Sequence, residues 1–452
     1  MLGNKIGFLK KLKPTQLVVL SFAFVILVGT LLLMLPFSSR DGQSVGGLTA
    51  LFTATSATCV TGLVLVDTWL NWTLFGQIVI LLMIQLGGLG FMTVIALFFF
   101  ALDRRITLSQ RLMMASTFNL NDMDGIVRLV RHALQGTFLF EGIGTLILSI
   151  CFIPEYGLLG GVWRGIFHAV SAFCNAGFDL MGGHGPFSSL SEYSDRPIVL
   201  LTVMLLIIVG GLGFFVWEDI LRTKSWKGLQ LYSKMVLCGT AGLIFLSWIV
   251  ITASEGSNPD TLGNMPVWEK LLNGLFQSVT LRTAGFNVID QGAMEPATVL
   301  ISVLLMLIGG CGGSTAGGIK VGTVLILLLG VRVGLTGREE VTLCGRSVPP
   351  RRVFDAMTLV FVVMVLFVGG TLALSTANGV SLLAAAFETA SALGTVGLTM
   401  GITTSLSTGS KLIVIMLMFL GRVGILSFSM AFLTRRRHEP KIKYPNFDIM
   451  VG

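Results

Sequence analysis

The chain has 452 residues, of which 53% are hydrophobic and only 12% are charged, and its formal net charge is +8. Soluble domains carry a charged share of about 25%, so the composition excludes an ordinary soluble protein and predicts one that spans a membrane. No paired-carboxylate, zinc-binding or phosphate-binding motif occurs and the six cysteines show no CxxC spacing, so nothing in the sequence indicates an enzyme, a catalytic residue or a resident metal.

Eight apolar segments, each long enough to cross a bilayer, follow one another along the chain. They are expected over 16–36, 72–101, 134–154, 197–221, 232–253, 296–331, 353–376 and 409–434. Basic residues from Lys5 to Lys13 precede the first segment, and no small-residue cleavage site follows it. We therefore interpret this segment as a transmembrane helix rather than as a signal peptide.

A shorter, semi-polar stretch lies between the two members of each pair of apolar segments. These four stretches cover 46–62, 161–177, 269–285 and 383–397. Each begins like a helix and ends in glycine, and each is too short and too polar to cross the membrane. This pattern is typical of re-entrant pore helices with their loops.

The short stretches share one motif. Three follow the pattern Phe-x3-Ser-x5-Gly and end in Gly62, Gly177 and Gly397. The third stretch ends in Gly285 but departs from the pattern, because its Phe moves to position 276 and Val279 replaces Ser. A second glycine cluster follows inside the next apolar segment of every repeat, over 85–91, 209–214, 308–320 and 420–424.

Two coupled motifs that recur four times predict four tandem repeats, each made of a helix, a pore helix, a filter loop and a helix. The expected fold is all-α integral membrane, with eight transmembrane helices and four re-entrant pore helices around one pseudo-fourfold pore. The expected divisions are 1–101, 102–221 with a cytoplasmic linker, 222–331 with a broken Gly-rich inner helix, 332–434, and a cytoplasmic tail over 435–452.

Charge asymmetry gives an orientation. Most of the 31 Lys and Arg residues fall in the segments that this layout assigns to the cytoplasm. The positive-inside rule therefore predicts a multi-pass protein of the plasma (inner) membrane with both termini in the cytoplasm. The segments assigned to the outer side are acidic, which would raise the local concentration of cations.

The repeated glycines predict a cation filter. A dehydrated monovalent cation needs oxygen ligands, which a ring of four backbones can supply as carbonyls, and glycine permits the necessary turn. The expected potassium-binding residues are Val60, Thr61, Gly62, Leu63, Asn175, Ala176, Gly177, Phe178, Thr283, Ala284, Gly285, Phe286, Thr395, Val396, Gly397 and Leu398. The alternative is that these glycines only mark loops between spans, which four matched loops disfavour.

The third inner segment predicts a gate, because its glycine run cannot be comfortably helical. The expected gate residues are Gly309, Gly310, Cys311, Gly312, Gly313, Ser314, Thr315, Ala316, Gly317, Gly318, Lys320 and Arg422. A simple packing kink is the alternative for the glycine run. Arg422, a charge inside a span, either acts below the filter, binds carbonyls of the Gly-rich loop, or pairs with an inward carboxylate such as Glu141. Arg282 either braces its pore helix or tunes conduction.

On these four filter motifs and the Gly-rich third inner helix, the chain resembles the superfamily of Trk, Ktr and plant HKT cation transporters over nearly its whole length. Plant relatives that prefer sodium carry Ser at the first filter glycine, so Gly62 implies potassium selectivity. Trk-type subunits carry two additional N-terminal helices before the first repeat. Because the first repeat begins near residue 16 here, the chain looks like the membrane subunit of a Ktr-type potassium uptake system.

The resemblance also implies partners. It implies a homodimer with one pore per subunit, held in part by the tail from Lys441 to Gly452, on a cytosolic ring of nucleotide-binding, KtrA-like regulatory subunits. Membrane lipid is expected as a partner and nucleic acid is not. This chain is expected to hold no cofactor: K+ is the transported ion, Na+ a candidate activator, and nucleotide is expected only on the regulatory subunit.

Potassium uptake through a channel-like pore is therefore the function that the sequence favours. The alternatives are a Trk-like or sodium-coupled symporter, whose internal repeats usually form two halves rather than four pore loops, and a membrane-embedded enzyme. An enzyme would need a cluster of ionisable or metal-binding residues, and the sequence shows none.

Overall fold

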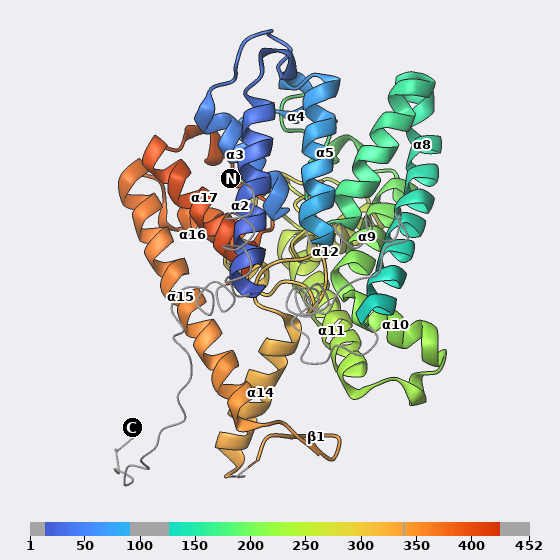
Figure 1. The fold of residues 1–452 in the computed structure, drawn as a ribbon, viewed down its shortest axis with the longest axis vertical. Helices are drawn as coiled ribbons and strands as arrows, with labels where there is room; N and C mark the ends of the chain where they lie inside the picture. Colours follow the sequence, from blue (N-terminus) through green and yellow to red (C-terminus); the bar gives the residue numbers. More distant parts are fainter. Residues whose placement is uncertain (1–13, 91–125, 338–339, 425–452) are drawn as a thin grey trace, which may run out of the picture.

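The computed structural model describes residues 14–90, 126–337 and 340–424, and helices dominate these ranges (Figure 1). The basic N-terminus, most of the cytoplasmic linker and the tail over 435–452 lie outside the described residues. The helices fall into four successive groups, and each group contains a short helix that runs up to one of the repeated glycines.

The first two groups come from the N-terminal half of the chain. The first comprises α2 (Pro14–Leu33), η1 (Pro36–Ser38), α3 (Gly47–Cys59), α4 (Thr68–Asn71) and α5 (Leu74–Leu89). The second comprises α8 (Ile126–Phe173), η2 (Ser191–Tyr193), α9 (Pro197–Leu212) and α10 (Phe214–Thr223). Helix α8 is bent at Gly157, which has a φ of 72°. Its second part, 158–173, is the short helix of this group.

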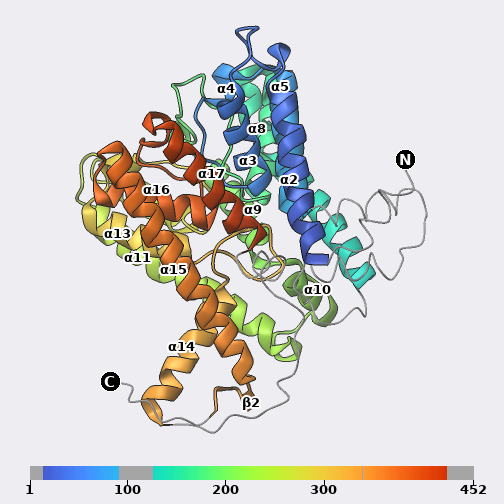
Figure 2. The ribbon, with the colours of Figure 1, turned by 60° about the vertical axis from the view of Figure 1, so that its left-hand side comes forward.

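The last two groups follow the same order. The third comprises η3 (Trp226–Gly228), α11 (Leu231–Glu255), α12 (Val267–Thr280), η4 (Gln291–Ala293), α13 (Pro296–Leu307) and α14 (Val321–Thr336). The fourth comprises α15 (Pro350–Asn378), α16 (Leu382–Gly394), η5 (Thr403–Ser405) and α17 (Thr408–Val423). Between them, β1 (Thr342–Leu343) and β2 (Arg346–Ser347) form a small antiparallel hairpin beside the ends of α14 and α15 (Figure 2).

Local sequence explains where several helices begin. Proline occupies one of the first two positions of α9, α13 and α15, where its missing N–H costs no hydrogen bond. Ser381 and Ser407 each precede a helix and accept a hydrogen bond from a backbone N–H in its first turn. These caps start α16 and α17 close to one face of the molecule.

Three of the helices that follow the short helices end at glycines in a left-handed conformation. These are Gly90, Gly213 and Gly424, with φ of 78°, 92° and 86°. At Gly213 the chain turns by 93° between α9 and α10, a bend that the predicted apolar segment over 197–221 did not anticipate. The reason is local, because a glycine with this φ cannot continue an α-helix. The segments that come directly after Gly90 and Gly424 lie outside the described residues.

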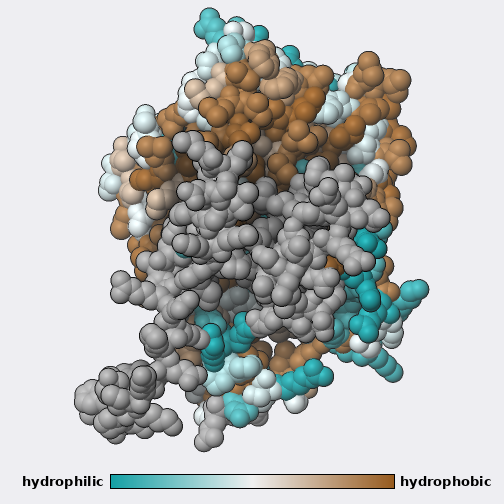
Figure 3. Space-filling view, in the orientation of Figure 1, coloured by the Kyte–Doolittle hydropathy of each residue, from teal (hydrophilic) through white to brown (hydrophobic). Residues whose placement is uncertain are grey.

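Four described helices are long and apolar enough to cross a membrane, and a fifth is obtained if α9 and α10 count as one span. They are parts of α2, α8, α11 and α15, and the outward side chains of these helices are largely apolar. Figure 3 shows the hydrophobic side chains gathered on the upper part of the molecule and hydrophilic ones at its edges. The chain thus has the helices of a membrane-spanning protein, whereas the number of eight spans stays a prediction.

The four groups close into a ring. The helix after each short helix packs against the short-helix region of the next group, in the pairs α5 with α8, α9 with α12, α13 with α16, and α17 with α3. The phenylalanines of the repeated motif, Phe52, Phe167, Phe276 and Phe387, are fully buried. This cyclic packing brings the ends of all four short helices to the centre of the molecule.

Candidate functional site

The four repeated glycines lie next to one another at this centre. A methyl group added to Gly62 would lie 2.6 Å from the carbonyl oxygen of Ala176, and one added to Gly177 would lie 2.8 Å from that of Ala284. The same holds for Gly285 and Val396, at 2.5 Å, and Gly397 meets the carbonyl oxygen of Thr61. Each glycine therefore approaches the backbone of the next group, and the fourth returns to the first.

We call the segments 60–63, 175–178, 283–286 and 395–398 the glycine turns. All sixteen residues proposed from the sequence as ion-binding lie in these turns, and the side chains of the twelve that are not glycine are almost fully buried. In every turn the residue two positions before the glycine is left-handed, with φ from 54° to 67° at Val60, Asn175, Thr283 and Thr395. Because β-branched residues avoid this conformation, the surroundings must hold it in place.

Backbone hydrogen bonds help to keep the glycine turns in this conformation. In the first, second and fourth turns, the N–H before the glycine donates to a serine carbonyl in the last turn of the short helix, with lengths of 2.7–2.8 Å. In the third turn, Ala284 N donates to Thr280 O at 3.0 Å. Each glycine turn is thus tied to the short helix of its own group.

Hydroxyl side chains provide a second tie, in two forms. Ser56 and Ser391 accept hydrogen bonds from the glycine N–H of their own turns, at 3.1 and 3.0 Å. Ser171 instead donates to the carbonyl of Phe178 at 2.7 Å, and Thr280 donates to that of Phe286 at 2.5 Å. The first and fourth groups therefore share one form, and the second and third share the other.

Thr280 is a residue of this site that sequence reasoning missed. Sequence comparison aligned Val279 with the serines of the other stretches and left the third without a hydroxyl. The structure gives that role to Thr280, one residue later. The shift of Phe from 275 to 276 was the available signal, because moving the whole motif by one residue also brings Thr280 into line.

A row of buried polar side chains, three residues before these hydroxyls, supports the segments that follow the turns. His168 Nε2 accepts from Leu180 N at 3.4 Å, and Gln277 pairs with Gln291. Glu388 accepts from the hydroxyls of Thr399 and Thr403 at 2.7 and 2.6 Å. The equivalent Thr53 hydroxyl has no partner among the described residues.

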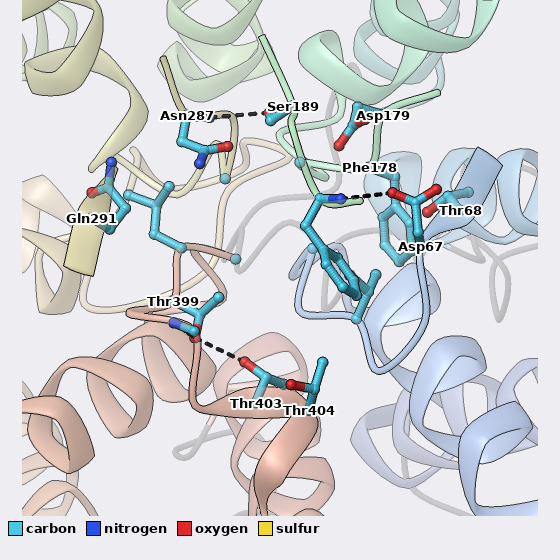
Figure 4. A pocket seen from close by; sticks show the side chains of 18 residues that line it. Asp67, Thr68, Phe178, Asp179, Ser189, Asn287, Gln291, Thr399, Thr403 and Thr404 are labelled. Atoms are coloured by element: carbon cyan, nitrogen blue, oxygen red, sulfur yellow. Dashed lines mark hydrogen bonds between the residues drawn. The ribbon is translucent and has the colours of Figure 1, made fainter. Parts of the chain in front are cut away.

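A cavity of about 160 Å³ opens beside the four glycines. Figure 4 shows polar side chains around it from several groups, including Asp67, Asp179, Asn287 and Thr399. Asp67 is fixed by the backbone N–H groups of Leu70 and Phe187, at 2.8 and 2.9 Å. Burial and then the nearby charge of Asp67 raise the pKa of Asp179 to about 7. The cavity thus presents oxygen atoms and negative charge beside the ring of glycines.

Residues 309–320 form a loop between α13 and α14, next to the glycine turns. We call it the glycine loop. Its two ends are joined by hydrogen bonds from Gly309 N to Ile319 O, at 2.9 Å, and from Ile319 N to Leu307 O, at 3.1 Å. Its middle lies against the second group, where the Thr315 hydroxyl donates to Phe173 O at 3.2 Å. The run of glycines is therefore an interruption of the helix and a docked loop, rather than a kink.

Two cationic side chains bind carbonyls of the glycine loop. Arg422 donates to Thr315 O, and also to the carbonyls of Gly87 and Gly88 in the first group. Lys320 donates to Ala316 O at 2.6 Å and to Gly317 O at 3.2 Å. Arg422 thus connects the fourth group, the first group and the loop.

The pairing of Arg422 with Glu141, which the sequence left open, is not the arrangement observed. Glu141 is buried and accepts from Gln85 Nε2 at 3.0 and 3.2 Å, and the partners of Arg422 are backbone carbonyls. No group of three or more His, Cys, Asp or Glu residues in the described ranges is placed to hold a metal ion. The six cysteines are free thiols.

Comparison with known proteins shows to which family this chain is similar. The model of the TrkH family, described as cation transport protein, matches residues 8–439. The chain is 42% identical over 450 residues to the potassium/sodium uptake protein NtpJ of Enterococcus hirae, covering 98% of each chain. It is 39% identical over 439 residues to the Ktr system potassium uptake protein B of Bacillus subtilis, covering 97% of each.

A solved structure matches the fold. The potassium transporter TrkH from Vibrio parahaemolyticus aligns with a TM-score of 0.72, over 92% of this chain and 83% of that one. Because the two sequences are only 19% identical, this match speaks for the fold alone.

Proposed function

We propose that this chain, which belongs to the TrkH family of cation transport proteins, takes up potassium ions through a pore whose filter is the ring of four glycine turns. The single observation that carries the proposal is the cyclic approach of Gly62, Gly177, Gly285 and Gly397 to one another's backbones. Family membership supports cation uptake across a membrane, and the ring supports this particular route.

The chemistry of the ring suits a dehydrated cation. The carbonyls of Thr61, Ala176, Ala284 and Val396 lie between neighbouring glycines, where no side chain intervenes. Rings of backbone carbonyls replace the hydration shell of K+ in selective pores. The short helices end at these turns, so the negative ends of their dipoles also favour a cation there.

Selectivity for K+ over Na+ rests on glycine at all four turns, Gly62 included. The two relatives named above are called a potassium/sodium uptake protein and a potassium uptake protein, respectively. We propose K+ as the transported ion of this chain and Na+ as an activator rather than a second substrate.

The glycine loop, with Lys320 and Arg422, is proposed as the gate. The loop interrupts its helix beside the glycine turns, since a methyl group on Gly317 would meet Thr395. Arg422 holds the carbonyl of Thr315 and places a positive charge close to the path of a cation. Releasing that contact would free the loop and move the charge.

The regulatory arrangement follows from the family rather than from the chain's own contacts. Ktr system proteins from Bacillus subtilis and Vibrio alginolyticus are similar to this chain, and their names describe them as members of a system. We propose a homodimer in the plasma membrane, with cytoplasmic termini and a cytosolic ring of nucleotide-binding KtrA-like subunits.

Flux through the purified chain in liposomes tests the proposal. We expect K+ uptake that Na+ competes with poorly, and we expect Gly62→Ser to reduce this discrimination severalfold. Gly47→Ser, at the start of α3 and away from the ring, is the matched control. Unchanged ion competition in Gly62→Ser would argue against a filter made of backbone carbonyls.

A further inference from the structure

Arg282 is a buried arginine that the proposed filter and gate do not yet use. It lies three residues before Gly285, just after α12, and only 8% of its surface is exposed. Its Nη2 donates to the carbonyl of Gly309 at 3.3 Å. Within the described ranges, no carboxylate lies at ion-pair distance from it. A buried charge of this kind needs other compensation, and a backbone carbonyl is its observed partner.

The carbonyl that Arg282 binds lies at the neck of the glycine loop. Gly309 N pairs with Ile319 O, Ile319 N pairs with Leu307 O, and Ile308 and Ile319 form a parallel bridge. These bonds join the point where the chain leaves α13 to the point where it approaches α14. Arg282 therefore attaches to the fixed end of the loop, whereas Arg422 attaches to its middle.

The site is favourable for a positive charge. Helix α13 ends at Leu307, so the negative end of its dipole lies at this neck. The guanidinium of Arg282 binds the carbonyl of Gly309, two residues beyond that end, and the helix dipole in turn compensates the buried charge. Each of the two features thus stabilises the other.

One donor of Arg282 remains without a partner. Its Nη1 is buried and makes no hydrogen bond to the described residues. A small cavity of about 10 Å³ lies beside the side chain, lined by residues that include Gly211, Thr240 and Gly310. A space of this size is about the smallest that can hold one water molecule. The guanidinium therefore has a free donor next to the loop.

The other three groups have no charge at the equivalent position. Three residues before the glycine they have Cys59, Cys174 and Gly394. The arginine occurs only in the third group, which is also the group whose inner helix is interrupted by the glycine loop. The arginine therefore occurs together with the glycine loop and is not a feature shared by the four repeats.

We propose that Arg282 is a positioning residue of the gate, which ties the neck of the glycine loop to the third glycine turn. The inference rests on the proposed function, because it assigns to Arg282 a role in the gate proposed above. Arg282 holds the neck in place, so the middle of the loop moves about a fixed point when Arg422 releases it. Without the guanidinium the neck is loose and the closed position of the loop is less populated.

The test measures K+ flux into liposomes for Arg282→Gln in two backgrounds, the full chain and a variant that lacks residues 311–317. We expect Arg282→Gln to raise flux about fivefold in the full chain, because one charge-assisted hydrogen bond to the loop is lost. In the shortened variant we expect no further increase. Arg282→Lys keeps one donor and should raise flux less than Arg282→Gln does.

Arg164→Gln is the matched control, since Arg164 is also buried but lies within a short helix and stacks on Trp69 and Tyr156, away from the loop. It should not raise flux. An Arg282→Gln effect that is equal in both backgrounds, or a loss of flux in both Arg282 variants, would overturn the assignment. So would a loss of K+ over Na+ discrimination, which would place Arg282 with the filter. If deletion of residues 311–317 does not by itself raise K+ flux, the proposed gate is wrong. This result differs from those above, which contradict only the role of Arg282.

Discussion

The glycine turns and the glycine loop both depend on glycine but are held by different bonds. Each turn is tied to the short helix of its own group, by a backbone hydrogen bond and by a hydroxyl such as Ser56 or Ser171. The middle of the loop is tied mostly to other groups, through Phe173 and Arg422. Hydrogen bonds within a group keep a turn in its conformation even when neighbouring groups move. Hydrogen bonds between groups break when the groups move relative to one another. The turns are thus suited to a fixed filter and the loop to a moving gate.

The largest expected effect comes from adding a side chain to the ring. Gly285→Ala would place a methyl group 2.5 Å from the carbonyl of Val396 and 2.9 Å from the Cα of Gly177, and neither backbone atom can move without distorting its turn. The left-handed φ of 83° adds a strain of about 1–3 kcal/mol. We expect potassium uptake by cells that express this variant to be lost.

Gly292→Ala is the control for that substitution. Gly292 lies in η4, seven positions along the same segment, and the nearest atom to an added methyl group is the Asp290 carboxylate at 3.3 Å. Uptake should stay close to that of the unmodified chain. Equal behaviour of the two variants would contradict a close-packed ring.

The next effect concerns the loop. Arg422→Gln removes the charge that binds Thr315 O and the Gly87 and Gly88 carbonyls, so the closed loop loses charge-assisted hydrogen bonds. Loss of about 1.4 kcal/mol of stabilisation corresponds to roughly a tenfold change in the closed-to-open ratio. We expect K+ flux in liposomes to rise by up to that factor, with unchanged K+ over Na+ discrimination.

Arg332→Gln, on the exposed surface of α14, supplies the control for loss of charge. Its flux should not change. If Arg422→Gln altered ion discrimination while leaving flux the same, the division between a fixed filter and a moving gate would be wrong.

A smaller effect distinguishes the two forms of hydrogen bond that the hydroxyl side chains make to the glycine turns. Ser391→Ala leaves the buried N–H of Gly397 without its acceptor, which costs about 1–3 kcal/mol at the turn itself. Ser171→Ala removes a donor to Phe178 O, one residue beyond its glycine. We expect ion competition assays to show weaker K+ over Na+ discrimination in Ser391→Ala than in Ser171→Ala. The reverse order would indicate that the carbonyl after the glycine matters more.

The smallest effect depends on the pH at the cavity beside the glycine turns. The pKa of Asp179 is raised to about 7, so its carboxyl is mostly anionic at pH 8 and mostly neutral at pH 6. Loss of this negative charge lowers the local cation concentration at the cavity. We expect the half-saturating K+ concentration to rise about two- to threefold between pH 8 and pH 6, as a nearby unit charge in a partly aqueous setting would produce.

Asp179→Asn should show the higher value at both pH values, with no slope between them. Asp195→Asn, which changes an exposed carboxyl between η2 and α9, should keep the slope. A slope that survives in Asp179→Asn would assign the titration to another group.

Much of this arrangement was predictable because it follows from repetition. The membrane character, the helical fold, the family and the positions of the four glycines follow from composition and from a motif that recurs. The bend at Gly213 was not predicted, because the apolar run continues through it and only the backbone conformation interrupts the helix. Thr280 was missed because the third stretch is shifted by one residue within its helix.

Most contacts between groups could not be read from the sequence, although binding of Arg422 to carbonyls of the glycine loop was one of the options it left open. Arg422 and its carbonyl partners are separated by 107 residues or more along the chain, and backbone acceptors carry no sequence signal. The same applies to Arg282 and Gly309. An arginine that binds a backbone carbonyl, rather than a carboxylate, has no complementary side chain that could be recognised in the sequence.

The most direct measurement is to locate a heavy potassium analogue, such as Rb+ or Tl+, by anomalous scattering from crystals of the purified chain. The account predicts a peak on the axis of the ring, within contact distance of the carbonyl oxygens of Thr61, Ala176, Ala284 and Val396. A well-occupied ion bound elsewhere, with none at those four carbonyls, would contradict it.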